Sequence, residues 1–164
     1  MKRKLTLEQR VARLERMASK NESEFSQESV NLGGFSWTKI GELNGYSLYL
    51  CDDIVKEMYF TGLSSETDEW KNSGIRKWLN SDFYRTLTPE ERSSIISYNG
   101  DRLFLLSEDE YKKFEGNIPR VDGWWWLRSP GTDSYSTASV YRHEVKNSTS
   151  DLDEIGVRPA VLLD

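Results

Sequence analysis

Residues 35–51 read FSWTKIGELNGYSLYLC, and this stretch predicts a β-hairpin. Two runs rich in β-branched and aromatic side chains flank Asn44-Gly45, the residue pair that the type I′ turn of a two-residue hairpin favours. Cys51, the only cysteine in the sequence, ends the second run. A lone cysteine inside an apolar run is typical of a small buried hydrophobic residue rather than of a disulfide or a reactive thiol.

Two helices are predicted to follow the hairpin. Ser73 can cap a helix over residues 73–85. Residues 88–91, TPEE, combine an N-cap threonine with proline at the first helical position, and so begin a short second helix that would bury Ile95 and Ile96. The apolar face of the first helix consists of Ile75, Trp78, Leu79, Phe83 and Leu87.

The second half of the sequence is richer in strands. Residues 107–110, SEDE, form a capping box that opens a third helix through about Phe114. Runs of β-forming residues predict strands over 102–106, 124–128, 138–142 and 157–163. Two strands, then helices, then several strands indicate an α+β fold with an antiparallel sheet and flanking helices, not alternating βαβ units.

The first twenty residues predict an oligomerising helix. Thr6 and Gln9 form a capping box, and apolar residues then recur at alternating spacings of four and three, as in the seam of a coiled coil. The segment 10–15, RVARLE, is similar to a short trimerisation motif in which arginine meets the glutamate of another strand. The alternatives are a dimer and a lone helix packed on its own domain. The trimerisation residues are Leu7, Arg10, Val11, Leu14, Glu15 and Ala18.

Three segments are therefore expected along the chain. Residues 1–20 form the coiled-coil helix, the polar and aperiodic residues 21–32 form a linker, and residues 33–164 form one globular domain. Residues 1–20 carry a net charge of +5, so the remainder of a chain whose net charge is −5 carries −10. An acidic main domain argues against nucleic acid as its ligand.

Targeting signals are absent from the sequence. No stretch approaches the ~18 apolar residues of a membrane span, and no apolar core of a signal peptide follows Lys2-Arg3-Lys4. The expected locations are therefore a virion or the cytoplasm, without membrane insertion.

Several ordered motifs carry a resemblance to a known family. Residues 68–80, DEWKNSGIRKWLN, look like the "tW..S.iR.WLN" signature of an uncharacterised domain family of Gram-positive bacteria and their phages. Residues 103–107, 125–131 and 156–160 match its "FLLS", "WWLRSPG" and "GVRPA" segments. The resemblance spans about residues 35–164.

That family is similar, in its C-terminal half, to the C-type-lectin-like fold shared by formylglycine-generating enzymes and by the variable proteins of diversity-generating retroelements. The resemblance implies a terminal strand that returns to the core and preceding strands and loops that display a ligand site. Arg128 and Arg158 lie in family motifs and are expected to make structural hydrogen bonds or ion pairs.

The polar segment 131–154 is the expected recognition surface. From Thr132 to Glu154, fifteen of twenty-three residues are Ser, Thr, Asp, Asn, Tyr or His, the mixture that paratopes use and that adenine-targeted mutagenesis would produce. The alternative is a plain polar loop. In a strand over 138–142, Ala138 and Val140 would face inward and Tyr141 outward. The candidate ligand-binding residues are Trp124, Ser134, Tyr135, Tyr141, Arg142, His143, Asn147 and Thr149.

The sequence lacks the parts of a catalytic or metal centre. It contains one histidine and one cysteine, so zinc sites and Cys-His catalysis are incomplete, and no P-loop, G-x-S-x-G or lectin calcium motif is present. No metal or other cofactor is expected. The favoured function is a non-enzymatic display protein, such as a phage tail tip or fibre component, that binds a cell-surface protein or glycan. The alternatives are a structural baseplate or adaptor protein that contacts other virion proteins and, last, a formylglycine-generating-like enzyme.

Overall fold

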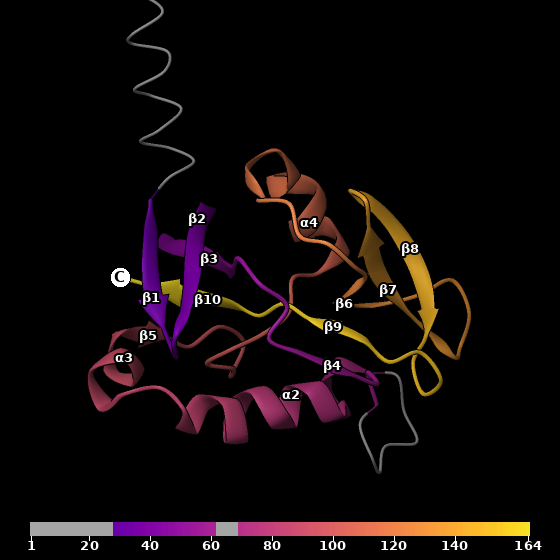
Figure 1. Ribbon diagram of the computed structural model, residues 1–164, viewed down its shortest axis with the longest axis horizontal. Coiled ribbons are helices and arrows are strands. Elements are labelled where there is room, and N and C mark those ends of the chain that lie inside the picture. The colour runs from indigo at the N-terminus through magenta and orange to yellow at the C-terminus, as the bar shows by residue number, and fades with distance from the viewer. Residues whose placement is uncertain (1–27, 62–68) are drawn as a thin grey trace, which may run out of the picture.

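The computed structural model describes residues 28–61 and 69–164 and has an α+β fold built on two five-stranded sheets (Figure 1). The predicted α+β class is thus confirmed, although two sheets are present where one was expected. The coiled-coil segment 1–20, with its six trimerisation residues, lies outside the described residues.

The first sheet contains the predicted hairpin. Its turn residues Asn44 and Gly45 have φ values of 54° and 81°, as a type I′ turn requires. The C-terminal strand lies beside the hairpin, between its second strand and an edge strand, and all pairings in this sheet are antiparallel. In spatial order the strands are β1 (Ser29–Leu32), β2 (Phe35–Leu43), β3 (Tyr46–Cys51), β10 (Ala160–Leu163) and β5 (Ile95–Ile96).

The second sheet carries the polar segment 131–154. Its strands in spatial order are β4 (Lys56–Met58), β9 (Ile155–Val157), β6 (Trp125–Pro130), β7 (Ser136–Tyr141) and β8 (Glu144–Thr149). β6 and β9 pair in parallel, whereas β7 and β8 form an antiparallel hairpin. Figure 1 shows this hairpin at the opposite side of the molecule from β1 and β2.

The helices begin where the sequence predicts. Ser73, Thr88 and Ser107 each accept a hydrogen bond from the backbone N–H three residues later, and the last two complete capping boxes. The first helix changes to π-helical hydrogen bonding midway. The helical elements are η1 (Trp70–Asn72), α2 (Gly74–Trp78), η2 (Leu79–Phe83), α3 (Pro89–Ser94), α4 (Glu108–Phe114) and η3 (Glu115–Asn117).

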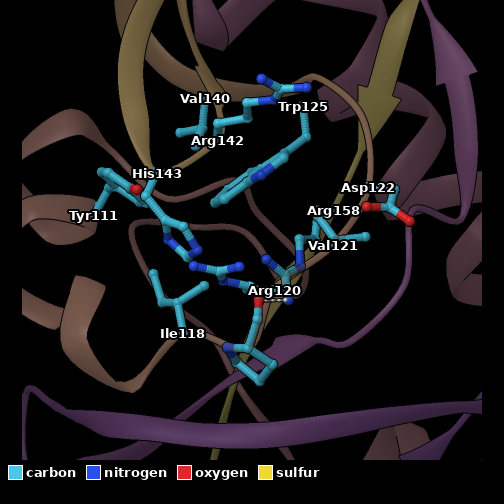
Figure 2. Close-up of a pocket in the computed structure, with 11 residues that line it drawn as sticks. Tyr111, Ile118, Arg120, Val121, Asp122, Trp125, Val140, Arg142, His143 and Arg158 are labelled. Carbon is cyan, nitrogen blue, oxygen red and sulfur yellow. Dashed lines mark hydrogen bonds between the residues drawn. The ribbon is translucent and has the colours of Figure 1, made fainter.

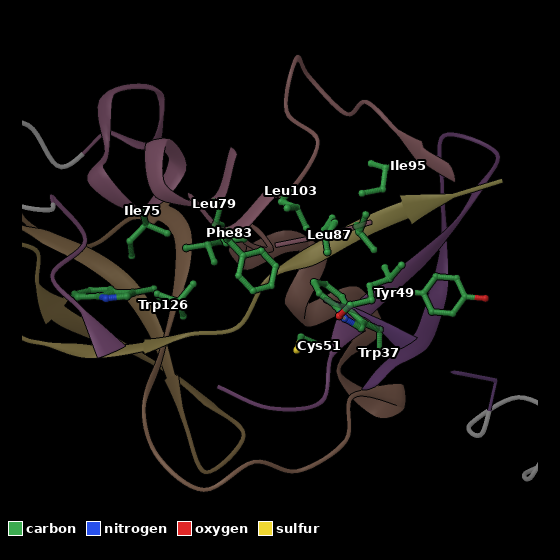
Figure 3. Packing of buried hydrophobic residues seen from close by; sticks show 14 of the residues in the cluster. Trp37, Tyr49, Cys51, Ile75, Leu79, Phe83, Leu87, Ile95, Leu103 and Trp126 are labelled. Carbon is green, nitrogen blue, oxygen red and sulfur yellow. The ribbon is translucent and has the colours of Figure 1, made fainter. Parts of the chain in front are cut away.

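Both faces of the first sheet are buried. Tyr49 and Val161 point to a cluster formed with the α2–η2 helix (Figure 3), whereas Leu48 and Leu162 point to a cluster formed with α4 and the second sheet. This double burial explains why β3 and β10 read as nearly continuous apolar runs. Cys51 is fully buried in the first cluster, and burial raises the pKa of its thiol to about 12.

Several boundaries differ from the predicted ones. The helix after Thr88 ends at Ser94, and Ile95–Ile96 pair with β10, as suits β-branched side chains. Residues 102–106 contain a single bridge, Phe104 to Ala160, rather than a strand. Residues 29–32, predicted to be linker, form β1.

The C-terminal half also departs from its prediction. Residues 157–163 form two strands in different sheets, because Pro159 between them cannot donate a ladder hydrogen bond. Within 131–154, the strand predicted over 138–142 is part of β7, whereas β8 lies in a part of the segment that was not predicted to be a strand. A membrane-spanning helix is not found in the described part of the chain.

Candidate functional site

A cleft of about 310 Å³ opens where the β7–β8 turn faces the loop after η3 (Figure 2). Its floor is formed by buried side chains from four separate parts of the chain: Tyr111, Ile118, Trp125, Val140 and Arg158. Its rim carries Pro119, Arg120, Val121, Asp122, Arg142 and His143. Three arginines, one histidine and one carboxylate therefore line a single small depression.

Arg158 is held in the floor by backbone carbonyls. Its Nε donates to the Cys51 carbonyl at 2.7 Å, and one amino group donates to the Pro119 carbonyl at 2.8 Å. The chain between β9 and β10 passes from one sheet to the other at this residue, which brings the side chain under the 118–122 loop. The structural hydrogen bonds predicted for Arg158 are confirmed.

The guanidinium of Arg158 nevertheless has no direct ion pair, although Asp52 and Asp53 lie near enough to offset part of its desolvation. Arg158 is 1% exposed, and within the described part of the chain no carboxylate lies at ion-pair distance from it. Burial lowers the pKa of its guanidinium to about 10. The guanidinium stacks over Trp125 at 5.1 Å from the ring centroid, and its second amino group, Nη1, has no hydrogen-bond acceptor among the described residues. A buried cation in this state is unusual outside functional sites.

Tyr111 adds a second unsatisfied group to the same floor. The residue is 1% exposed, and its hydroxyl has no hydrogen-bond partner in the described structure. Burial raises the pKa of this hydroxyl, so it remains a neutral donor. In Figure 2 the hydroxyl lies on the side of the ring that faces His143 and the cleft. Buried polar groups are nearly always satisfied, so an unpaired hydroxyl here indicates a position for a ligand atom.

Arg142 and His143 form the turn of the β7–β8 hairpin. Their φ values are 51° and 63°, in the left-handed region that favours glycine or asparagine. The hairpin turn in the first sheet uses Asn44-Gly45 for the same backbone conformation. Two large side chains, an arginine and a histidine, thus occupy positions where they cost backbone strain, a situation that clusters at binding sites.

An aromatic pair borders the cleft. The rings of Trp124 and Tyr141 stack at a centroid distance of 4.6 Å with planes 6° apart, and Trp124 is 37% exposed. Trp124 is placed by its carbonyl, which accepts a hydrogen bond from Gly156 at 2.9 Å. A Cβ at position 156 would lie 2.7 Å from that carbonyl, so the close pairing of β6 and β9 requires glycine.

The structure brings half of the predicted ligand-binding residues together. Arg142 and His143 lie on the cleft rim, and the Trp124–Tyr141 pair lies beside it. The other four lie away from the turn. At ~3.3 Å per strand residue, Asn147 is about 13 Å along the hairpin and Thr149 about 20 Å, with Ser134 and Tyr135 at the same far end as Thr149.

Two of these distant residues have structural roles. The Asn147 side-chain oxygen accepts from the Thr132 backbone N–H at 3.1 Å, and the Thr149 backbone N–H donates to Asp153. Tyr135 is 75% exposed, but the cleft does not include it. The single site predicted over 131–154 is therefore divided between the two ends of the hairpin.

The predicted facing of β7 is correct only in part. Ala138 and Val140 are buried as expected. Ser139, expected to face outward, is also fully buried and hydrogen-bonds to Ser148 at 2.9 Å. Tyr141 is half-buried against Trp124, and Arg142 lies in the turn rather than in the strand.

The candidate site residues in this cleft that sequence reasoning missed are Tyr111, Arg120, Trp125 and Arg158. The first lies in a helix and the others in three different segments, so no local pattern joins them. The available signal was Arg158 itself, a charged residue inside the otherwise apolar run 157–163.

Arg128, by contrast, has the ion pair that its motif predicted. It forms two hydrogen bonds with Glu110, which also accepts from the Tyr98 hydroxyl at 2.8 Å. Burial alone would raise the pKa of Glu110, but the hydrogen bonds from Arg128 and the Ser107 backbone outweigh it and lower the pKa. Within the described residues, no group of three or more His, Cys, Asp or Glu side chains could hold a metal ion.

Comparison with known protein families gives one match. The sequence matches the family described as Domain of unknown function (DUF6273) over residues 44–101 and 97–164, which together span most of the chain and all of the cleft. Comparison with curated proteins and with solved structures found no match.

Proposed function

Because the chain belongs to the DUF6273 family, whose description assigns no function, we propose from its geometry that it is a non-enzymatic ligand-binding protein. The proposed ligand is a cell-surface protein or glycan, held in the cleft at the β7–β8 turn. The family match supports one continuous domain over residues 44–164 and leaves the activity to be argued from the site.

One observation carries this proposal: residues with backbone strain or unsatisfied polar groups converge on one cleft. Arg142 and His143 occupy left-handed positions, and the Tyr111 hydroxyl is buried without a partner. Each of these features lowers the stability of the free domain, so a ligand that satisfies them would explain their retention. The exposed Trp124 adds rigid aromatic contact area of the kind that binding sites favour.

We further propose a C-type-lectin-like head. The arrangement that supports it is the return of the final strand, β10, to the first sheet beside the hairpin, with the ligand cleft on the strands that precede it. Diversification of 131–154 by a retroelement would act on its exposed residues, which lie at 132–135, 142–144, 147 and 151–154.

Display on a trimeric stem, as in a phage tail tip or fibre, completes the proposed function. Three heads on one stem would raise the apparent affinity for a repetitive surface by ~10²–10⁴-fold without any new contact. The predicted seam of residues 1–20 supplies the stem. A structural adaptor in a virion remains the rival function, because an adaptor would use the same surface for another virion protein.

A saccharide and cell-surface-protein array tests the proposal. The full chain is applied together with the variants Trp124→Ala and Tyr141→Ala, and with Tyr135→Ala as a matched control at the far end of the same hairpin. Loss of an aromatic residue at the cleft should weaken binding by ~1–3 kcal/mol, whereas Tyr135→Ala should leave binding unchanged.

Thermal unfolding of the same variants completes the experiment. Tyr141→Ala should unfold at nearly the temperature of the parent chain. If this variant fails to fold, the tyrosine is a core residue and the cleft-side assignment is wrong. Binding that survives both cleft variants but is lost in Tyr135→Ala would move the site to the far end of the hairpin.

A further inference from the structure

We propose that the group bound in the cleft is an oxyanion, a phosphate or carboxylate substituent of a saccharide. This inference rests on the proposed function and adds the chemical class of the ligand. Three observations support it: hydrogen-bond donors without acceptors in the floor of the cleft, an excess of cationic side chains around them, and an acidic protein elsewhere.

The charge of the cleft is the first observation. The lining contains three arginines, Arg120, Arg142 and Arg158, and one carboxylate, Asp122, so these four side chains together carry a net charge of +2. In the described part of the chain none of these three arginines forms an ion pair. Figure 2 shows Arg120 and His143 pointing toward the middle of the cleft, with Asp122 at its edge.

The protein around the cleft has the opposite charge. Outside residues 1–20 the chain carries a net charge of −10, so the cleft is a local cationic site on an acidic molecule. A polyanion such as nucleic acid would meet repulsion around the cleft, because its charges repeat every few ångströms beyond the binding site. A small anion confined to the cleft would not. The electrostatics therefore favour one compact acidic group on a larger neutral framework.

Unsatisfied donors are the second observation. The Tyr111 hydroxyl is a buried side-chain atom without a hydrogen-bond partner in the described structure. Nη1 of Arg158 also lacks an acceptor among the described residues, but this atom is open to the cleft rather than buried. Phosphate and carboxylate oxygens are acceptors that arginine and tyrosine donors can bind together. A neutral hydroxyl could satisfy Tyr111, but only an anion also compensates the buried charge of Arg158.

A backbone-pinning role for Arg158 does not account for these features. Its Nε and Nη2 bonds to the carbonyls of Cys51 and Pro119 hold the loop in place. Those bonds leave Nη1 free and leave the charge unpaired, whereas the partly buried Arg128 has a carboxylate on both of its amino groups. The same molecule thus shows what a purely structural arginine looks like.

Calorimetric titration of the full chain with four probes tests the inference. Glucose, glucuronate and glucose 6-phosphate share one ring and differ in charge, and inorganic phosphate lacks the ring. At least one of the two acidic sugars should bind about tenfold or more tightly than glucose, as expected for charge-assisted hydrogen bonds. The tighter acid identifies whether carboxylate or phosphate is the source of the oxyanion.

Three variants locate the binding. Tyr111→Phe removes the unsatisfied hydroxyl alone, and Arg120→Gln removes an exposed cation, so both should remain folded. Each should weaken binding of the acidic sugar by about tenfold. Arg85→Gln, a change of an exposed arginine in the first helical region, is the matched control and should leave binding unchanged. Arg158→Gln is not used, because losing its three hydrogen bonds to backbone carbonyls would itself destabilise the domain.

The outcomes separate this inference from the proposed function. Glucose binding as tightly as both acids, in a Trp124-dependent manner, would overturn the anion and leave the ligand-binding function intact. Acid binding that Tyr111→Phe and Arg120→Gln do not weaken would overturn the cleft as the anion site. Failure of the proposed function would instead appear as an array without any binding that depends on Trp124 or Tyr141.

Discussion

At the scale of single residues, the partly buried Arg128 and the fully buried Arg158 have different partners. Arg128 pairs with Glu110 and is fully compensated, whereas Arg158 bonds to backbone carbonyls and keeps an unpaired charge. Both lie in family-like motifs, WWLRSPG and GVRPA, and both were expected to be structural. A motif shows that a residue type is required, but the partner that decides its role comes from a distant part of the chain.

The Glu110–Arg128 pair should make stability depend on pH. Glu110→Gln leaves Arg128 buried without its partner, so the free energy of unfolding should fall by about 3 kcal/mol at pH 7. The folded-state pKa of Glu110 is lowered from 4.5, so the contribution is complete above that pH and is lost as the pH falls through the folded-state pKa. Urea titrations at a series of pH values should therefore show the difference between variant and parent shrinking below about pH 4.5.

Glu108→Gln provides the control for this experiment. Glu108 lies in the same helix and pairs with Lys112 at 3.3 Å, but both side chains are more than a third exposed. An exposed pair of this kind contributes less than about 1 kcal/mol. A comparable loss in both variants would show that the helix terminus, and not the buried pair, is responsible.

At the scale of the elements, features that depend on residues close in sequence were predicted correctly, whereas features that depend on contacts between distant residues were not. The capping residues Ser73, Thr88 and Ser107 were predicted correctly, because each cap depends on a residue only three positions away. The hairpin at Asn44-Gly45 was predicted for the same reason. Of the second hairpin, only residues 138–141 were predicted to be strand. The start of β7, the turn and β8 were missed because Arg142-His143 is an atypical turn and the strands are polar.

The burial of β7 shows the physical origin of that miss. Thr137 and Ser139 are fully buried, where apolar side chains would be expected, because they hydrogen-bond to Ser150 and Ser148 across the hairpin. Paired hydroxyls can be buried at little cost, so hydrophobic alternation does not reveal such a strand. The cleft was equally hidden, since its floor is assembled from four separate segments.

Replacing the residues of the β7–β8 turn tests whether that turn is strained. Replacing both turn residues, Arg142→Asn with His143→Gly, gives the second hairpin the same turn residues as the first. Asparagine and glycine adopt the left-handed conformation at lower cost than arginine and histidine, so the free energy of unfolding should rise by about 1–2 kcal/mol. The double variant should also lose affinity for the ligand. A variant that is less stable than the parent chain in urea titration would contradict the strain argument.

At the scale of the whole molecule, the predicted stem should determine assembly. Light scattering should give a mass about three times 19.1 kDa. Leu14→Asp places a charge in the predicted seam and should release single chains whose head unfolds at an unchanged temperature. Ala12→Asp, outside the predicted seam, is the matched control and should remain trimeric. A parent chain that stays monomeric at high concentration would rule out the stem.

The location of the ligand site is the central claim, and the six tryptophans of the chain report on it. Trp125 lines the cleft and Trp124 borders it, whereas Trp37, Trp70 and Trp126 donate their indole N–H groups to partners elsewhere in the fold. Trp78 lines a different cleft, near Lys56. The six indole resonances therefore separate binding at the β7–β8 turn from binding elsewhere.

The decisive measurement is the change of these six indole N–H resonances when the tightest-binding saccharide of the probe series is added to the full chain. The resonances of Trp124 and Trp125 should shift in proportion to saturation, while the other four stay in place. Shifts at Trp78, or saturable binding that leaves both Trp124 and Trp125 unmoved, would contradict the assignment of the site.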